Sequence, residues 1–297
     1  MIHHEGHSGY SPENVVVLPQ GGFLGAVLDF DDTITSPIIP KGPMRGQRLH
    51  DVSRVLAAHE IGIELNNGYL MNLTTEQSQE SYEKAAEPTL EGSIAYLFKK
   101  AGIFSSKSNY DRYDEHLLRF MDRRSALHLR MLKDHAGLNE GAEPLLEYLS
   151  KETKYGIAVA SMAVLPEIEV VFDKYGLEAY IPPERIFTRT HVKKHKPDRE
   201  VNDRGLRSFG ADISWEDRTR FLGVDDSRGG VESIHRAGMF PIGLATNLTP
   251  DRFNGTYSKI VVPSLRDVLR IAKASKSSQK DKPLAWSRGR IASVEAA

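Results

Sequence analysis

The sequence has 297 residues, with 39 Lys and Arg against 40 Asp and Glu and a formal net charge of −1. A hydrophobic fraction of 40% and a charged fraction of 27% are typical of globular proteins and argue against a fibrous or wholly disordered chain. The near-neutral charge gives no reason to expect a nucleic acid as partner. Because the chain has no cysteine, disulfides, thiol catalysis and thiolate-bound metals are excluded.

The two ends of the chain differ in character from the rest. Residues 1–21 are polar and lack an apolar run of the length that a signal peptide needs, so we expect a flexible leader. No stretch approaches the roughly 18 apolar residues of a membrane span, so we expect no membrane partner and a cytoplasmic location. Residues 276–297 are rich in Ser and Lys without a sustained period and are predicted to be a disordered tail.

From residue 22 onward, short apolar runs alternate with helical segments. The predicted strands are apolar runs bounded by Gly, Pro or charged residues, namely 25–28, 156–160, 185–187, 219–224, 241–244 and 259–262. The predicted helices between them are 143–151, 166–175, 199–209, 230–237 and 264–272. This alternation predicts a Rossmann-like α/β fold, in which a parallel sheet carries helices on both faces.

One long stretch of the sequence interrupts the alternation. Residues 35–139 show little strand signal, and their helical patterns cover 48–59, 78–86, 90–100 and 113–135. We therefore expect an inserted all-helical cap domain over residues 35–139 and an α/β core formed by residues 22–34 and 140–275. A cap inserted after the first strand could close over a site at the strand ends.

The first predicted strand is followed by the acidic sequence Asp29-Phe30-Asp31-Asp32-Thr33. A parallel strand that ends in carboxylates places them at the carboxyl edge of the sheet, where open α/β folds bind ligands. Two carboxylates there repel each other unless a cation is present, and their hard oxygens suit Mg²⁺. One carboxylate could attack a phosphoryl group while the other handles the proton of the leaving oxygen. Taken alone, this segment is equally well explained as an acidic turn.

Three later segments carry chemistry that complements these carboxylates. Ser161 follows the second predicted strand with a hydroxyl that can hold a phosphate oxygen. The basic run 193–196 ends in Lys196-Pro197, and the pair Asp225-Asp226 follows the strand over 219–224. Each feature alone is common, since Ser often follows strands and basic runs are usually solvated. Their joint occurrence at successive strand ends favours a phosphoryl-transfer site.

In this order, the four segments resemble the four motifs of the haloacid dehalogenase (HAD) superfamily. The matching residues are, in motif order, Asp29-Phe30-Asp31-Asp32-Thr33, Ser161, Lys196 and Asp225-Asp226-Ser227. The run from Asp226 to Met239 is similar to the DS-x-x-G-x-x-A-x-x-A-G-M segment of the subfamily that includes β-phosphoglucomutase and phosphoglycolate phosphatase. The resemblance covers about residues 22–275, and the helical cap matches by its placement after the first motif.

The resemblance implies roles for individual residues. Asp29 would be the nucleophile that forms an aspartyl-phosphate, and Asp31 would protonate the leaving group and then activate water. Ser161 and Lys196 would hold the phosphoryl oxygens of the substrate. Thr33 is counted with this phosphate-binding group and would support the motif loop by hydrogen bonds.

The resemblance also implies a Mg²⁺ cofactor. The carboxylates of Asp29, Asp225 and Asp226 and the main-chain carbonyl of Asp31 would be its ligands. The choice of Lys196 over Lys193 or Lys194 as the motif lysine depends on the Lys-Pro pair alone.

Two departures from the subfamily pattern affect the predicted site. Asp32 stands where Gly is usual, and its extra carboxylate could face solvent or alter the metal affinity. The spacing between the third and fourth motifs is slightly longer than expected and predicts a surface insertion near residues 203–204. Neither departure removes a catalytic group.

The leading functional interpretation is a Mg²⁺-dependent phosphatase that hydrolyses a small phosphorylated metabolite through an aspartyl-phosphate. Two alternatives stay open: a phosphomutase on the same fold, and a phosphometabolite-binding protein without catalysis. A receiver-type signalling domain is disfavoured because its acidic pair lies on the first strand and its phosphorylated Asp comes later. The sequence leaves the substrate and the oligomeric state undetermined.

Overall fold

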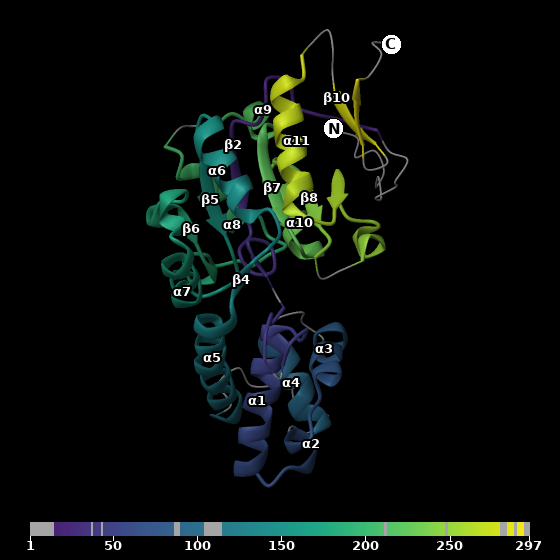
Figure 1. The fold of residues 1–297 in the computed structure, drawn as a ribbon. Coiled ribbons are helices and arrows are strands. Elements are labelled where there is room, and N and C mark those ends of the chain that lie inside the picture. The colour runs from purple at the N-terminus through teal and green to yellow at the C-terminus, as the bar shows by residue number, and fades with distance from the viewer. Residues whose placement is uncertain are drawn as a thin grey trace. The chain divides into compact units, whose positions relative to one another are not determined.

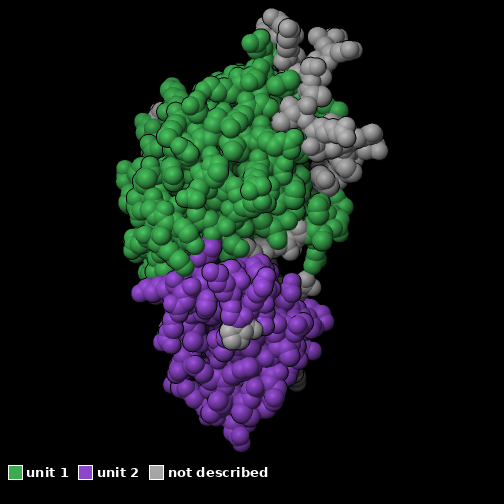
Figure 2. Space-filling view, viewed as in Figure 1, with its two compact units in different colours: residues 1–36, 138–297 green, residues 37–137 purple. Residues whose placement is uncertain are grey.

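The computed structural model describes residues 15–36, 38–42, 44–85, 90–103, 115–210, 213–246, 249–279, 284–287 and 290–293. The chain forms two compact units, which Figure 1 shows as a ribbon and Figure 2 in two colours. The first unit consists of residues 1–36 and 138–297, and the second of residues 37–137. Most of the predicted leader, residues 1–14, lies outside the described residues.

The first unit is built on a six-stranded parallel sheet with the strand order β6-β5-β2-β7-β8-β9. The strands are β2 (Gly25–Leu28), β5 (Ile157–Ala160), β6 (Ile186–Phe187), β7 (Phe221–Asp225), β8 (Phe240–Leu244) and β9 (Ile260–Val262). Each coincides with a predicted strand to within two residues at either end. The six strand predictions are confirmed.

Helices cover both faces of this sheet. They are α6 (Ala142–Glu152), α7 (Leu165–Tyr175), α8 (Glu200–Arg207), α9 (Trp215–Arg218), α10 (Arg228–Arg236) and α11 (Leu265–Ser277). Four short 3₁₀ helices join them: η1 (Leu177–Ala179), η2 (Pro183–Arg185), η3 (Arg189–His191) and η4 (Pro250–Phe253). Helices α6 and α11 pack together on one face, whereas α8 and α10 pack on the other (Figure 1). This arrangement confirms the predicted α/β fold class.

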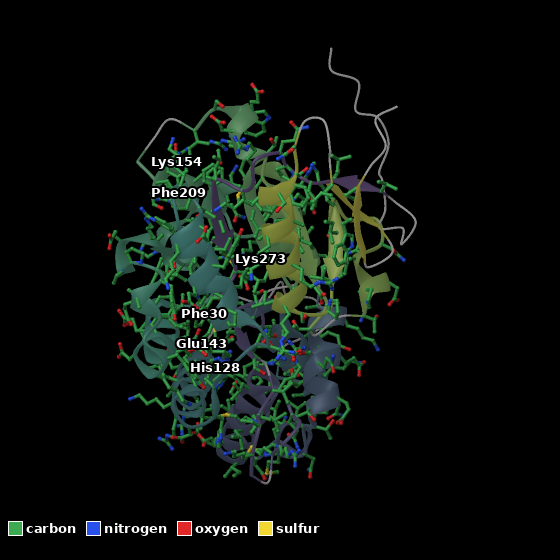
Figure 3. All side chains as sticks on the ribbon, turned by 45° about the horizontal axis from the view of Figure 1, so that its top comes forward. Phe30, His128, Glu143, Lys154, Phe209 and Lys273 are labelled. Atoms are coloured by element: carbon green, nitrogen blue, oxygen red, sulfur yellow. The ribbon has the colours of Figure 1, made fainter. Side chains whose placement is uncertain are left out.

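The strands are continuous apolar runs because helices cover both of their faces. Every residue of β2, β5 and β8 is buried. Two glycines allow the helices to approach closely, since a Cβ on Gly223 would lie 2.3 Å from the Ile234 side chain and one on Gly205 would lie 2.8 Å from Val27. An aromatic group formed by Tyr155, Phe209 and Phe221 closes the amino end of the sheet (Figure 3).

The described residues of the second unit form five helices with a core of their own. They are α1 (Leu49–Glu64), α2 (Gly68–Met71), α3 (Thr75–Lys84), α4 (Leu90–Lys100) and α5 (Glu115–His135). Its buried core includes Ile61, Leu97 and the edge-to-face pair Phe98 and Phe120. The all-helical character predicted for the insertion is confirmed, although the four residues of α2 were too few to show a helical period.

The insertion leaves and rejoins the first unit through a pair of short strands. β3 (Thr35–Ser36) and β4 (Gly137–Leu138) form a two-stranded sheet. None of the described helices combines the length and the apolar content that crossing a bilayer requires.

The two described ends of the chain meet in a three-stranded antiparallel sheet. β1 (Val16–Val17) pairs with β10 (Leu284–Ser287), which pairs with β11 (Arg290–Ser293). The prediction of a disordered tail from residue 276 onward therefore does not hold for β10 and β11. It does not hold for Ser277 either, which is the last residue of α11. Strands of two to four residues carry almost no periodic signal, and β1 and β10 find each other across nearly the whole sequence.

Substitutions of the two tryptophans of the chain test the packing of the terminal sheet. Trp286 in β10 is 8% exposed, whereas Trp215 in α9 is 57% exposed. Because truncating a buried aromatic side chain costs about 3–5 kcal/mol, Trp286→Ala should lower the free energy of unfolding by that order. Trp215→Ala should cost less than about 1 kcal/mol. Urea unfolding followed by circular dichroism measures both, and equal costs would contradict the packing of β10.

Candidate active site

The sheet brings the predicted acidic residues together at its carboxyl edge. β2 and β7 are neighbours, and Leu28 pairs with Val224 at their carboxyl ends. The main-chain N–H of Asp29 donates to the Val224 carbonyl at 3.0 Å, which fixes Asp29 beside Asp225. β5 lies on the other side of β2, so Ser161 follows the neighbouring strand end.

Lys196 joins these carboxylates from the loop between η3 and α8. Its Nζ donates to Asp29 Oδ1 at 2.5 Å and to Asp225 Oδ2 at 2.8 Å. Lys193 and Lys194 contact a different residue. Their main-chain N–H groups donate to the Glu200 carboxylate at 3.1 and 2.9 Å. Of the three lysines that the sequence left open, Lys196 is the one whose ammonium contacts the predicted nucleophile.

Three carboxylates form a group that could hold a metal ion. Asp29, Asp225 and Asp226 each offer an oxygen, and these oxygens lie within 4.8 Å of one another. Asp29 and Asp225 are buried, and Asp226 is half-buried. The side chain of Asp31 is not part of this group, and its main-chain carbonyl as a metal ligand stays a prediction.

The charges of the group explain why a cation fits. Burial raises the pKa of Asp29 from 3.8 to about 7, an effect that Lys196 opposes and Asp225 reinforces. Burial alone would lower the pKa of Lys196, but Asp225 and Asp29 outweigh it and raise that pKa above its usual value. One ammonium thus faces three carboxylates, and a divalent cation would stabilise the charged form of Asp29. Hard carboxylate oxygens suit a hard divalent ion.

The segment after β7 holds the Asp225 carboxylate from two sides. The N–H and the hydroxyl of Ser227 donate to Asp225 Oδ1 at 2.9 and 2.7 Å. Ser227 is also the N-cap of α10, because its Oγ accepts the N–H of Gly230 at 3.0 Å. A Cβ on Gly230 would lie 1.8 Å from Asp225 Oδ2. The sequence from Asp225 to Gly230 is therefore one closely packed unit.

The loop after β2 adopts a conformation that explains why the subfamily that the sequence resembles usually has glycine where this chain has Asp32. Asp32 has a φ of +59°, in the left-handed region that glycine enters most easily and Asp tolerates. The residue is buried, so the carboxylate does not face solvent, one of the two possibilities that the sequence left open. The Asp32 carbonyl accepts hydrogen bonds from Thr246 Oγ1 and Asn139 Nδ2, both at 2.8 Å.

Asn139 is a positioning residue that sequence reasoning missed. Its Nδ2 lies 2.8–2.9 Å from the carbonyl oxygens of Asp32, Thr33 and Thr35. One amide thereby fixes the loop that contains Asp31. No sequence pattern indicated this role, because Asn139 lies more than 100 residues from that loop, directly after the helical insertion.

The two hydroxyls predicted to bind phosphate differ in their surroundings. Ser161 is buried, and its Oγ accepts the N–H of Ala163 at 3.0 Å, a bond that leaves the O–H able to donate. The buried Thr33 Oγ1 has no hydrogen-bond partner among the described residues. The hydrogen bonds that Thr33 makes in this loop come from its main chain, whose N–H donates to the Phe30 carbonyl and whose carbonyl accepts from Asn139.

The surface insertion predicted near residues 203–204 is absent from the structure. Both residues lie within α8, and Asp203 is buried in ion pairs with Arg218 at 2.7 Å and Arg199 at 3.0 Å. The chain between α8 and β7 instead forms the short helix α9. A length difference in sequence does not say where the extra residues lie, because a helix and a loop accommodate them equally well.

Two adjacent glycines test the packing against Asp225. Gly230→Ala should displace the Asp225 carboxylate and lower the free energy of unfolding by about 1–3 kcal/mol, because the added Cβ overlaps it. Gly229→Ala is the matched control, since its Cβ would meet nothing within 4 Å. That substitution should be neutral or stabilise by up to about 1 kcal/mol through helix propensity. Urea unfolding measures both, and equal effects would contradict the close approach.

Asp29→Asn tests the raised pKa through the pH dependence of stability. The Asp29 carboxyl titrates near 3.8 in the unfolded chain and near 7 in the folded, metal-free protein. Between these pH values the folded state holds a proton that the unfolded chain has released, so the stabilisation is lost as the pH rises. In EDTA, the Tm of the wild type relative to Asp29→Asn should fall from about pH 4 to about pH 7.

The control for this experiment is Asp173→Asn, which removes an exposed carboxylate of α7. Its Tm difference from the wild type should stay nearly constant over the same range, because the Asp173 side chain is exposed to solvent on α7. A constant difference for Asp29→Asn as well would show that burial does not perturb Asp29.

The sequence and the fold both resemble those of known proteins. Residues 57–244, more than half of the chain, match the model of the haloacid dehalogenase-like hydrolases. The match begins after Asp29 and Asp31 and includes Ser161, Lys196 and Asp225-Asp226. No curated protein matches the chain significantly.

Solved structures share the fold at low sequence identity. A haloacid dehalogenase hydrolase of family IA, variant 3, from Entamoeba histolytica is 20% identical, with a TM-score of 0.62, covering 85% of this chain and 99% of its own. CbbY from Rhodobacter sphaeroides, solved with phosphate, is 15% identical, with a TM-score of 0.59 and coverages of 84% and 99%. A predicted phosphoglycolate phosphatase from Haemophilus somnus is 14% identical, with a TM-score of 0.61 and coverages of 84% and 97%. Because the family model matches more than half of its residues, the chain belongs to the haloacid dehalogenase-like hydrolase family.

Proposed function

We propose that this protein is a Mg²⁺-dependent phosphatase that hydrolyses a small phosphorylated metabolite. The observation that carries the proposal is the contact of Lys196 with both Asp29 and Asp225 at the ends of neighbouring strands. A buried ammonium between a nucleophile and a metal-binding carboxylate suits a reaction in which negative charge accumulates on a phosphoryl group. Two proteins of similar fold also support the proposal. One is CbbY, which was solved in complex with phosphate, and the other is described as a predicted phosphoglycolate phosphatase.

The proposed Mg²⁺ would be held by residues on two adjoining strand ends. Carboxylate oxygens of Asp29, Asp225 and Asp226 would be its ligands, together with the main-chain carbonyl of Asp31. When bound, the ion supplies positive charge that offsets the phosphoryl oxygens and the Asp29 carboxylate. The site contains only hard oxygen donors, which is the donor set that Mg²⁺ prefers.

The side chains of the site would divide the reaction into two steps. In the first, an Asp29 oxygen attacks phosphorus, the bond to the substrate oxygen breaks, and Asp31 donates its proton to that leaving oxygen. In the second, Asp31 takes a proton from water, and the water oxygen attacks the phosphorus of the aspartyl-phosphate. Phosphate then leaves, and Asp29 is regenerated. Lys196 and Ser161 would hold the phosphoryl oxygens throughout.

The decisive experiment is phosphate release from sugar phosphates, nucleotides and phosphoglycolate, measured with Mg²⁺ and with EDTA. Wild-type protein should release phosphate from at least one ester, and EDTA should abolish the release. Asp29→Asn should lower the rate by about 10³-fold or more, since it removes the attacking oxygen while keeping the shape of the side chain. Asp173→Asn should leave the rate unchanged, because that carboxylate is exposed on α7.

A second readout separates metal binding from catalysis. Mg²⁺ should raise the Tm of the wild type by binding the folded state, and Asp226→Asn should reduce that shift. Release that persists in Asp29→Asn or in EDTA would overturn the proposal. A Mg²⁺-dependent rise in Tm without release from any ester would instead favour a phosphomutase that needs a bisphosphate primer, or a binding protein.

A further inference from the structure

A groove lies at the amino edge of the sheet, opposite the edge that carries the candidate active site. Its volume is about 430 Å³, within the range of small-molecule sites. Three of its lining residues stand at the amino ends of neighbouring strands: Arg220 before β7, Phe240 in β8 and Lys259 before β9. Residues 17–20, which continue from β1, form another wall.

The groove contains two cations that form no ion pair with a carboxylate of the described residues. The Lys259 ammonium lies 4.9 Å from the centroid of the Phe240 ring, and it forms no ion pair with the described residues. Arg220 Nη2 donates to the Gly22 carbonyl at 3.2 Å. Its Nε is buried and has no hydrogen-bond partner in the part of the chain that the structure describes. The residues that line the groove include no carboxylate.

The charge of Lys259 is weakly compensated. Desolvation lowers the pKa of Lys259, and no anion of the described residues raises it. The neighbouring His235 stacks on Tyr257, with ring centroids 4.1 Å apart. Its pKa is lowered by burial and then by the charge of Lys259, so it adds no compensating charge.

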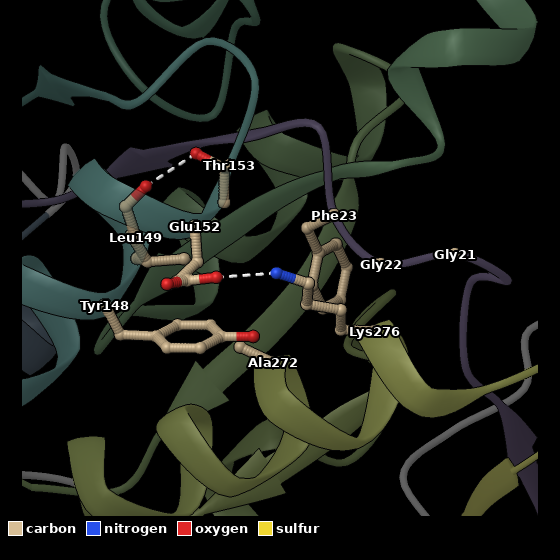
Figure 4. A pocket seen from close by; sticks show the side chains of 9 residues that line it. All are labelled: Gly21, Gly22, Phe23, Tyr148, Leu149, Glu152, Thr153, Ala272 and Lys276. Carbon is tan, nitrogen blue, oxygen red and sulfur yellow. Dashed lines mark hydrogen bonds and ion pairs between the residues drawn. The ribbon is translucent and has the colours of Figure 1, made fainter.

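Two other hollows of the first unit lack this property. A groove of about 500 Å³ is also lined by cations, but acidic side chains compensate them, as in the pair of Arg199 and Asp203 at 3.0 Å. The small cavity in Figure 4, beside Tyr148, measures about 30 Å³, which is room for one water molecule. The ion pair of Lys276 with Glu152, at 2.6 Å, lies at its edge (Figure 4).

We propose that the groove at the amino edge of β7, β8 and β9 binds a small organic anion, namely a carboxylate or phosphate group attached to an apolar body. Arg220 and Lys259 would bind the charged group, because neither forms an ion pair with a carboxylate of the described residues. Val17, which is half exposed, and the partly buried Pro19 line the groove, and their side chains would contact the apolar part. This site is separate from the candidate active site, and the proposal holds whether or not the protein is a phosphatase.

The test is titration calorimetry with three probes of similar size: benzoate, phenylphosphonate and the uncharged benzyl alcohol. Benzoate should bind at millimolar concentration or below, and benzyl alcohol should not bind measurably. Lys259→Gln and Arg220→Gln should each weaken benzoate binding about tenfold or more, because each removes a charge-assisted contact. Lys259→Arg keeps the charge and should retain binding within about threefold.

Lys154→Gln is the matched control. The Lys154 ammonium lies 4.8 Å from the centroid of the Tyr155 ring, nearly the same geometry as that of Lys259, but it does not line the groove (Figure 3). Its loss should leave benzoate binding unchanged. Thermal unfolding of every variant checks that the fold is intact.

The probes also distinguish the sources of the anion. Phenylphosphonate could also bind at the candidate active site. Binding there would survive Lys259→Gln and would be lost on adding inorganic phosphate, and this result would count against a phosphate ligand in the groove. Benzoate binding that is absent, matched by benzyl alcohol, or unaffected by both Lys259→Gln and Arg220→Gln would overturn the proposal.

Discussion

The constraint on which the candidate site depends is the repulsion between carboxylates that neighbouring strands hold side by side. Asp29 and Asp225 follow β2 and β7, and the Lys196 ammonium bridges them at 2.5 and 2.8 Å. A single ammonium does not balance them fully. Burial raises the pKa of Asp29, and Asp225 adds to this effect while Lys196 opposes it. Burial makes this imbalance costly, and it is also what would make a divalent cation bind strongly. The affinity that the site would have for a cation and its cost to folding would therefore have the same physical origin.

This charge imbalance persists only because the structure prevents the carboxylates from moving apart. The sheet fixes the main chain of Asp29. Ser227 holds the carboxylate of Asp225 by hydrogen bonds, and Gly230 leaves room for that carboxylate because it has no side chain. Asn139 fixes the loop around Asp31 by contacts with three main-chain carbonyls. Main-chain contacts of this kind place the loop whatever side chains it carries, which is consistent with Asp occupying a left-handed position where glycine is usual.

The sheet separates opposite charges along its strands. Carboxylates gather where β2 and β7 end, whereas Arg220 and Lys259 stand where β7 and β9 begin. Parallel strands make this possible, because all of their carboxyl ends lie at one edge and all of their amino ends at the other. The first edge has an excess of negative charge and suits a cation. The groove at the second has two cations that form no ion pair with a carboxylate of the described residues, and it suits an anion.

The sequence by itself determined the six strands of the sheet, the helical character of the insertion and the residues that meet at the carboxyl edge. It could do so because buried parallel strands are continuous apolar runs and because parallel strands align their ends. Only the tertiary structure decided that Lys196 rather than Lys193 or Lys194 contacts Asp29, that Asp32 is buried, and that the two ends of the chain form one sheet. It also brought Asn139 to the first motif loop and placed Lys259 and Arg220 in the lining of one groove. These contacts join residues far apart in sequence, and local patterns carry no information about such pairs.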